Sequence, residues 1–356
     1  MFNKLFRKQA ASTFGLDIGS SCVKVVQLKE SGDARALTGF GIVPLPNETI
    51  ADGSIRDPET VAAAIKEAVA KAGVKGEEAV ISICGRELII KKIQIPDVPE
   101  AEVADVVKLE AEHHIPFSIE EVFLDHHTIG VANGQRDLIL VAVKKQKVSE
   151  YMSVVEQAGF APLIVDVDGF ALGNQFELNN PDEGGEAVAL VDIGASVMKT
   201  NVVRSGTTIF ARDIPFGGSN YTQAIAQRLN ISFEQAEAAK LGKDVGVKWE
   251  TLVPALEAVS RDLSLEVQRT FDYFASTAES ERIGRIVLAG GCAQLPGLNE
   301  YLSSNWGIPV ELARPFDHIE VPPAYAEEVQ ALAPALAVVV GLGLRKPGDK
   351  DVTKKK

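Results

Sequence analysis

Two eight-residue segments have the residue types that hold a phosphate group, and each repeats the other. Residues 17–24 read DIGSSCVK and residues 192–199 read DIGASVMK, so five of the eight positions are identical. Both segments follow a short apolar run, and they lie about half the chain apart. Because repetition along a chain marks duplicated structural units, the match predicts two related lobes.

Each segment predicts a hairpin that faces a phosphate. The carboxylate at its start can hold a Mg²⁺ ion, usually through water. The glycine two positions later lets the chain turn sharply and brings backbone N–H groups close to the phosphate. A single Asp-x-Gly turn is also ordinary hairpin chemistry, so the prediction depends on the pair. The predicted phosphate-binding residues are Asp17, Gly19, Ser20, Ser21, Lys24, Asp192, Gly194, Ala195 and Ser196, with Asp17 and Asp192 on the metal.

A third segment has the pattern of a buried strand that runs into paired glycines. Residues 285–289 are apolar after the first, Gly290 and Gly291 follow, and a helix is predicted to begin at Leu298. Paired glycines let the backbone lie flat against a ring or a sugar. An ordinary strand–turn–helix connection is the alternative interpretation.

Strands and helices must position these segments, and apolar periodicity predicts that they alternate along the chain. The best-marked helix starts at Asp57-Pro58-Glu59 and ends at Gly73, which are typical start and stop residues. The predicted strands are 14–17, 23–28, 35–43, 80–83, 88–93, 138–143, 187–191, 199–203 and 285–288, and the predicted helices are 57–73, 99–116, 149–158 and 254–279.

Composition narrows the class of protein. The net charge of −13 argues against a nucleic-acid partner, which needs cationic side chains on its phosphates. The three cysteines have no metal or redox spacing, so we expect reduced thiols in a cytoplasmic protein. The apolar run 331–344 is too short to span a bilayer and contains Pro334. We therefore expect any membrane association to be indirect, and flexible ends at 1–12 and 346–356.

The three segments together resemble the motifs of the actin/Hsp70 ATPase superfamily: residues 17–24 its first phosphate motif, 192–199 its second and 286–297 its adenosine motif. Gly217 and Gly218, followed by residues 236–240, resemble its FtsA-type branch. The resemblance implies an α/β, actin-like (ribonuclease H-like) two-lobed fold that binds ATP with Mg²⁺. It also implies that Gly217, Gly218, Glu237 and Lys240 border the nucleotide, although Glu237 and Lys240 on one helix face also fit a solvated ion pair.

Within that branch, residues 13–345 resemble the family of type IV pilus assembly proteins called PilM. The likeness is carried by residues 14–21, 108–117 and 167–172. The family implies a first lobe (1A) at 13–90 plus 163–186, an inserted subdomain (1C) at 91–162, a second lobe (2A) at 187–215 plus 284–345, and subdomain 2B at 216–283.

The resemblance also implies a function. Such proteins are ATP-binding adaptors at the cytoplasmic face of the bacterial inner membrane, where they capture the N-terminal cytoplasmic segment of PilN. They thereby link the membrane complex to the assembly motors, with motor ATPases and the platform protein as further partners. The groove for PilN is expected between the first lobe and the insert, and its candidate residues, with an ordinary core as the alternative, are Ile89, Ile93, Val106 and Leu109.

Several functional alternatives stay open at the level of sequence. A chain of this fold could instead form FtsA-like filaments or be, less favoured, a small-molecule kinase. It could also form a homo-oligomer. No catalytic base stands out, so we expect slow ATP hydrolysis at most. Asp166 and Asp168 fall in a predicted connection between the lobes, where placing a water molecule and ordinary turn chemistry are the alternatives.

Overall fold

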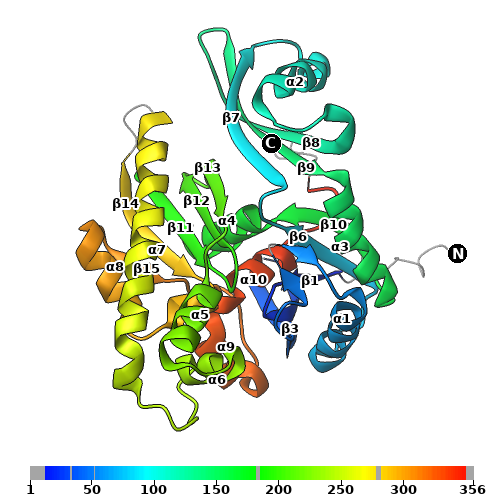
Figure 1. Cartoon of the computed structure of the whole chain (residues 1–356). Coiled ribbons are helices and arrows are strands. Elements are labelled where there is room, and N and C mark those ends of the chain that lie inside the picture. Colours follow the sequence, from blue (N-terminus) through cyan, green and yellow to red (C-terminus); the bar gives the residue numbers. More distant parts are fainter. Residues whose placement is uncertain (1–12, 33, 52, 182–184, 278–281, 350–356) are drawn as a thin grey trace, which may run out of the picture.

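Each half of the chain builds a five-stranded mixed sheet, and the two sheets have the same topology (Figure 1). The computed structural model describes residues 13–32, 34–51, 53–181, 185–277 and 282–349. In both sheets a three-stranded antiparallel meander is extended by two parallel strands. The order β10-β6-β1-β2-β3 joins β1 (Thr13–Ile18), β2 (Cys22–Ser31), β3 (Ala34–Pro44), β6 (Glu78–Ile83) and β10 (Ala161–Val167). The order β13-β12-β11-β14-β15 joins β11 (Ala187–Ile193), β12 (Met198–Arg204), β13 (Thr207–Ile214), β14 (Ile283–Ala289) and β15 (Val310–Leu312).

The equivalence of the two sheets confirms the predicted two-lobed fold. β1 and β11 are the central strands, and almost all of their side chains are buried because both faces of each sheet are covered. The predicted phosphate hairpins are the β1–β2 and β11–β12 turns. Each sheet therefore presents its hairpin from the same topological position.

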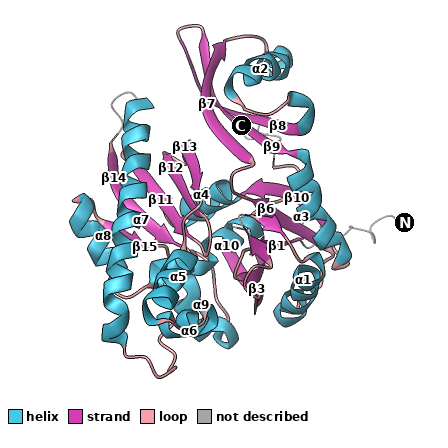
Figure 2. Cartoon of the chain, viewed as in Figure 1, coloured by secondary structure: helices cyan, strands magenta, loops and turns pink. Residues whose placement is uncertain are grey.

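Helices cover the outer faces as the sequence signals predict (Figure 2). In α1 (Pro58–Ala72) the Asp57 side chain accepts the Thr60 N–H, and Gly73 ends the helix in the left-handed conformation. At the corresponding place in the second lobe, between β13 and β14, stand α5 (Gly218–Leu229), α6 (Phe233–Lys240) and α7 (Trp249–Thr277). Helix α7 begins before the predicted residue 254, and its predicted end at 279 lies outside the described residues. Helix α8 (Leu298–Trp306) and the short turn η2 (Gly291–Gln294) precede β15.

Two helices lie between the sheets and join the lobes. One is α4 (Asp168–Asn179), and the other is α10 (Ala337–Gly343), which follows α9 (Pro323–Leu332) and η3 (Ala333–Leu336). They cross closely, since a Cβ on Gly341 would overlap the carbonyl of Ala171. The stretch Pro323–Gly343 meets the length and hydropathy of a membrane span, but half of that window is buried, and the side chains of α10 pack in the core between the lobes. The apolar run is thus explained by burial inside the protein.

A three-stranded antiparallel sheet projects from the first lobe (Figure 1). It contains β7 (Leu88–Pro96), β8 (Val122–Ala132) and β9 (Gln135–Lys144), with α2 (Glu100–His114) and η1 (Ile119–Glu121) packed on it. The next helix, α3 (Lys145–Gln157), returns to the core of the first lobe through Tyr151, Val154 and Val155. The hairpin β4 (Ile50–Ala51) and β5 (Ser54–Ile55) lies nearby. The boundaries 91–162 stay a prediction, and the packing of α3 favours an insert that ends near residue 144.

The sequence reasoning did not predict β8, β10, β13, α4, α9 or α10. The segment at Asp168 is the clearest case, because Asp-Gly indicates a turn in isolation. In the structure Asp168 is instead the first residue of α4, where a carboxylate is favourable near the positive end of the helix. The described part of the chain includes residues 346–349, where Lys346 pairs with Glu30, while the rest of the predicted flexible ends falls outside it.

Candidate functional site

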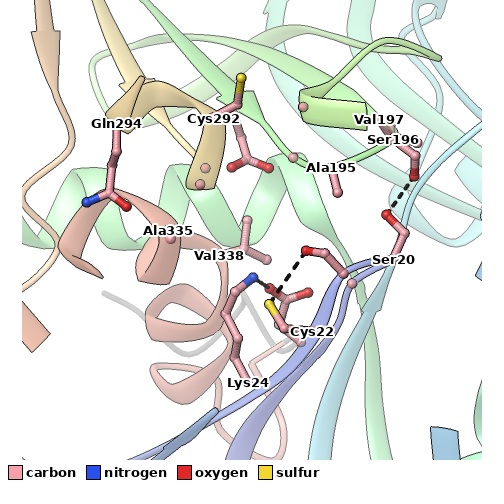
Figure 3. Close-up of a pocket in the computed structure, with 18 of the residues that line it drawn as sticks. Ser20, Cys22, Lys24, Ala195, Ser196, Val197, Cys292, Gln294, Ala335 and Val338 are labelled. Atoms are coloured by element: carbon pink, nitrogen blue, oxygen red, sulfur yellow. Dashed lines mark hydrogen bonds and ion pairs between the residues drawn. The ribbon is translucent and has the colours of Figure 1, made fainter. Parts of the chain in front are cut away.

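One cavity of about 590 Å³ lies between the two lobes, and both repeated hairpins reach it. Ser20 Oγ and Ser196 Oγ are 2.7 Å apart, so the two hairpin loops touch across the cleft. Figure 3 shows these serines pointing at each other on one side, with Gln294 and Cys292 on the opposite side. The predicted site residues that line the cavity are Asp17, Gly19, Ser20, Ser21, Lys24, Asp192, Gly194, Ala195, Ser196, Gly218, Lys240, Gly290 and Gly291.

The two hairpins close in the same way. The Gly19 N–H donates to the Cys22 carbonyl at 3.1 Å, and the Gly194 N–H donates to the Val197 carbonyl at 3.2 Å. A Cβ on Gly194 would lie 2.9 Å from that carbonyl oxygen, closer than side chains approach. Glycine is therefore required by the turn itself.

A lysine stands opposite each aspartate in the strand register. Lys24 pairs with Asp17 across β1–β2, and Lys199 pairs with Asp192 across β11–β12. The Nζ–Oδ2 distances are 2.7 Å and 2.8 Å. Burial alone lowers a lysine pKa, but the facing carboxylates outweigh it and hold the pKa values of Lys24 and Lys199 above their ordinary value. Both ammonium groups are therefore charged beside the cavity.

The second lysine also contacts the first lobe. Lys199 Nζ lies 3.2 Å from Asp168 Oδ2 at the start of α4. Burial raises the pKa of Asp168, but the Lys199 ammonium outweighs this effect, so the net shift is downward. The sequence pattern places Asp168 in a predicted connection and predicts no role for Lys199. Equivalence to Lys24 in the repeat was the signal that could have found Lys199.

A third carboxylate lies behind Lys199. Asp213 faces Lys199 in the β12–β13 register, and the Gly85 N–H donates to its Oδ2 at 2.6 Å. Burial raises the pKa of Asp213 to about 7, against the lowering effect of the Gly85 hydrogen bond. Gly85 lies in the short connection between β6 and β7, so this contact joins the second lobe to the base of the inserted sheet. No motif in the sequence marked it.

The glycine pair at the start of α5 holds the second hairpin. The Gly218 N–H donates to the Gly194 carbonyl at 2.9 Å, and the Ser219 N–H donates to the Ala195 carbonyl at 2.8 Å. A Cβ on Gly217 would lie 2.5 Å from both of those carbonyl oxygens. Gly217 therefore lets the helix dock on the hairpin, and only Gly218 of the pair lines the cavity.

The Glu237–Lys240 pair lies at the edge of the cavity. Lys240 lines it and donates to the Gly218 carbonyl at 3.1 Å and to Thr222 Oγ1 at 2.9 Å. Glu237 does not line the cavity but holds Lys240, with 2.7 Å between Oε2 and Nζ, and also accepts from Thr222. Glu237 thus holds the Lys240 ammonium group against α5, where it lines the cavity.

Away from the hairpins the cavity is lined mainly by apolar residues, and Gly290 lies where this part meets the second hairpin. Gly290 has φ of +86°, donates to the Pro334 carbonyl at 2.8 Å, and has no room for a Cβ beside the Ile193 carbonyl.

All three cysteines are free and line the cavity. Burial raises the pKa of Cys84 well above its ordinary value and that of Cys292 to about 12, so both thiols are protonated. Further lining residues that the sequence reasoning did not select are Tyr151, Trp249, Gln294, Leu295, Ala335 and Val338.

The donor set at the polar end suits a magnesium–nucleotide complex. Four carboxylates, those of Asp17, Asp168, Asp192 and Asp213, surround two ammonium groups. Within the described residues there is no cluster of three or more side chains able to hold a metal. A Mg²⁺ ion would therefore take most of its six ligands from phosphate oxygens and water, as it commonly does.

The predicted partner-groove residues differ in exposure. Leu109 on α2 has 66% of its surface exposed, and Ile89 and Val106 are partly buried against the core of the insert. Ile93 is 3% exposed and belongs to that core, which leaves it no surface for a partner in this conformation. The groove stays a prediction for the other three.

Comparisons with known proteins agree with this architecture. The family model of type IV pilus assembly protein PilM matches residues 15–347. The solved PilM-PilN type IV pilus biogenesis complex is similar with a TM-score of 0.85 and 27% identity, over 94% of this chain and 98% of that one. MreB5 of Spiroplasma citri bound to AMPPNP, at 12% identity and a TM-score of 0.53 over 94% and 95% of the two chains, shows the shared fold alone.

The match to a curated relative, a cell division protein, covers a smaller part of both chains. The cell division protein FtsA of Bacillus subtilis is 28% identical over 251 residues, which are 63% of this chain and 56% of FtsA. The chain thus spans little more than half of that protein. The likeness fits the FtsA-type branch, whereas the family match covers nearly the whole sequence. By its sequence over residues 15–347 and by its two-lobed fold, this chain belongs to the type IV pilus assembly protein PilM family.

Proposed function

We propose that this chain is an ATP-binding adaptor of the type IV pilus machine. It binds Mg-ATP between its lobes and the N-terminal cytoplasmic segment of a PilN-like protein at its inserted subdomain. In this role it is a cytoplasmic protein at the inner membrane that links the membrane complex to the assembly motors and the platform protein. The observation that carries the nucleotide part is the meeting of two equivalent Asp-Ile-Gly hairpins at one cavity. The likeness to a PilM-PilN complex supports the partner.

The chain's own residues supply positive charge and backbone donors to the phosphates. Lys24 and Lys199 approach from the two hairpins and Lys240 from α6. The hairpin serines, which touch each other at 2.7 Å, have hydroxyl groups that can turn to donate to phosphate oxygens instead. Bound Mg²⁺ would neutralise phosphate charge beside Asp17 and Asp192. Because the carboxylates outnumber the lysines at this end, nucleotide without the metal would meet net repulsion.

Hydrolysis is proposed to be slow. Asp168 lines the cavity without belonging to either hairpin, and Lys199 lowers its pKa. A lowered pKa makes a carboxylate a weaker base for activating water. Bound ATP would then stabilise one conformation of the adaptor. Slow hydrolysis would return the protein to its other conformation.

The decisive measurement is a calorimetric titration of the full chain with Mg-ATP, and then with a synthetic PilN N-terminal segment in the presence and absence of Mg-ATP. Asp17→Asn removes a carboxylate that is predicted to hold the Mg²⁺ ion. The variant should therefore bind Mg-ATP at least tenfold more weakly. Asp272→Asn, an exposed carboxyl group on α7, is the matched control and should bind normally.

The outcomes separate the parts of the proposal. Failure of the wild-type chain to bind Mg-ATP would refute the nucleotide site. Failure to bind the segment would refute the adaptor. Equal segment affinities with and without Mg-ATP would leave a static scaffold, since linkage requires the two ligands to change each other's affinity. Sedimentation with Mg-ATP tests self-association, and ATP-dependent pelleting would favour a filament instead.

A further inference from the structure

Two walls line the end of the cavity away from the phosphate hairpins. One wall comes from the end of α6 and the start of α7, with Leu241, Gly242 and Trp249. The other comes from the turn 290–296 and from α9 and η3, including Gln294 and Leu332. A flat apolar group between these walls would be covered on both faces.

Trp249 is positioned to cover one of those faces. It is the first residue of α7, and it is partly buried against the cluster formed by α5, α6 and α7 while also lining the cavity. Its neighbour at the cavity, Leu241, is 61% exposed, so its side chain is accessible to a ligand. The loop between them turns at Gly242 and Gly246, both with positive φ. An aromatic and an aliphatic side chain therefore flank the opening without covering each other completely.

Gln294 is positioned to read the edge of the same group. Its Nε2 donates to the Ala331 carbonyl, which can only accept, so this contact identifies the nitrogen side of the exposed amide. The Oε1 acceptor and the second N–H of the amide remain for a ligand. Figure 3 shows Gln294 reaching down from the turn toward the helix that carries Ala335. A glutamine amide that offers one acceptor and one donor matches adenine, whose amino group donates and whose adjacent ring nitrogen accepts.

We propose that Trp249 and Gln294 determine the base specificity of the nucleotide site. The indole stacks on the base, and the amide of Gln294 pairs with the amino edge of adenine. Guanine presents an acceptor where adenine presents its amino group, so it would place two acceptors face to face. This inference rests on the proposed nucleotide-binding function and extends it to the choice of base.

The chain offers its own control for the stacking part. It contains two tryptophans. Trp306 packs against Phe271 in the core of the second lobe, with 5.9 Å between ring centroids, and does not line the cavity. ATP should therefore change the tryptophan emission of the wild type and of Trp306→Phe, and leave the emission of Trp249→Phe unchanged.

Affinities for Mg-ATP, Mg-GTP and Mg-tripolyphosphate, measured by calorimetry on the full chain, test the energetic part. Base stacking on an aromatic side chain is worth enough that Trp249→Leu should weaken ATP binding about tenfold or more. Tripolyphosphate has no base, so its affinity should not change. Gln294→Leu should reduce the preference for ATP over GTP about tenfold, because one base-edge pairing is lost.

Five results would overturn the inference. Equal wild-type affinities for ATP and GTP would remove base selection. Unchanged ATP affinity in Trp249→Leu would remove stacking, and equal loss of ATP and tripolyphosphate in that variant would show that Trp249 only supports the fold. A wild-type chain that binds tripolyphosphate and ATP equally refutes the inference alone. A chain that binds neither refutes the proposed nucleotide site together with it.

Discussion

Asp213→Asn should stabilise the protein at neutral and alkaline pH and have little effect in acid. Asp213 is a partly exposed carboxylate whose pKa is raised to about 7 by burial and by the negative charge of Asp168. Asparagine is nearly the same size and can still accept the Gly85 N–H. The substitution therefore removes the charge of the side chain and keeps its contact with the base of the inserted sheet.

The direction of the pH dependence follows from linkage. The ordinary pKa of an aspartate is 3.8, so between pH 4 and pH 7 the unfolded chain has lost the Asp213 proton and the folded chain retains it. Folding then binds a proton, and wild-type stability falls as pH rises through this window. Above pH 7 both states are ionised, and the loss is complete.

The pKa shift of Asp213 sets an upper limit on the stability gained by Asp213→Asn. A raise from 3.8 to about 7 corresponds to about 4 kcal/mol at about 1.4 kcal/mol per pKa unit. Because the side chain is partly exposed, solvent screening lowers the expected gain to about 2 kcal/mol. The gain for Asp213→Asn should thus grow from about zero at pH 4 to about 2 kcal/mol at pH 8.

Urea denaturation of wild type and variant, at half-unit steps from pH 4.5 to 8.5, measures this difference directly. Asp272→Asn, whose carboxylate accepts a hydrogen bond from Gln268 at the surface of α7, is the control and should show no such trend. A difference between Asp213→Asn and wild type that is constant with pH, or that shrinks toward pH 8, would refute the reasoning.

Three further predictions concern the contacts between the lobes and the metal. Gly341→Ala places a Cβ on the Ala171 carbonyl where α10 crosses α4, and it should lower the melting temperature by several degrees or prevent folding, as calorimetry would show. Lys199→Met leaves the buried carboxylates of Asp168 and Asp192 without their cation and should destabilise the chain by about 3 kcal/mol at pH 7, with less loss at pH 4 in urea titrations. Chelation of Mg²⁺ by EDTA should weaken ATP binding at least tenfold in a fluorescence titration, because the carboxylate excess then repels the free triphosphate.

The repeat predicted two related lobes with a hairpin in each, whereas the actin-like fold was implied by the resemblance to a known superfamily. Two copies of an eight-residue pattern constrain each other, and the Asp-x-Gly spacing directly encodes the hairpin that the structure shows at Gly19 and Gly194. The contacts that depend on tertiary packing could not be predicted. Asp213 lies at the end of an unremarkable strand, and only the pairing of β12 with β13 brings it beside Lys199.

Local sequence signals also gave wrong secondary structure where tertiary packing determines the backbone conformation. Asp168-Gly169 has the composition of a turn, yet the burial of Ala171 and Leu172 between the two sheets makes the segment a helix. Helix α10 has no capping side chain and is rich in valine, which weakly disfavours helix formation. Its conformation is set by the space between the lobes, and sequence periodicity does not describe that space.

The two hairpins have the same local geometry but different attachments, and the second hairpin connects the cavity to the contacts between the lobes. Lys24 pairs within its own lobe, whereas Lys199 also holds Asp168 of the helix that leads out of the first lobe. The serine contact at 2.7 Å and the Gly85–Asp213 hydrogen bond add two more links between the halves. A triphosphate that takes the serine hydroxyl groups and draws Lys199 toward its oxygens would alter all three links together. Since one of them ends at the base of β7, the inserted sheet would respond to the nucleotide through its attachment point, without a contact between the nucleotide and the insert.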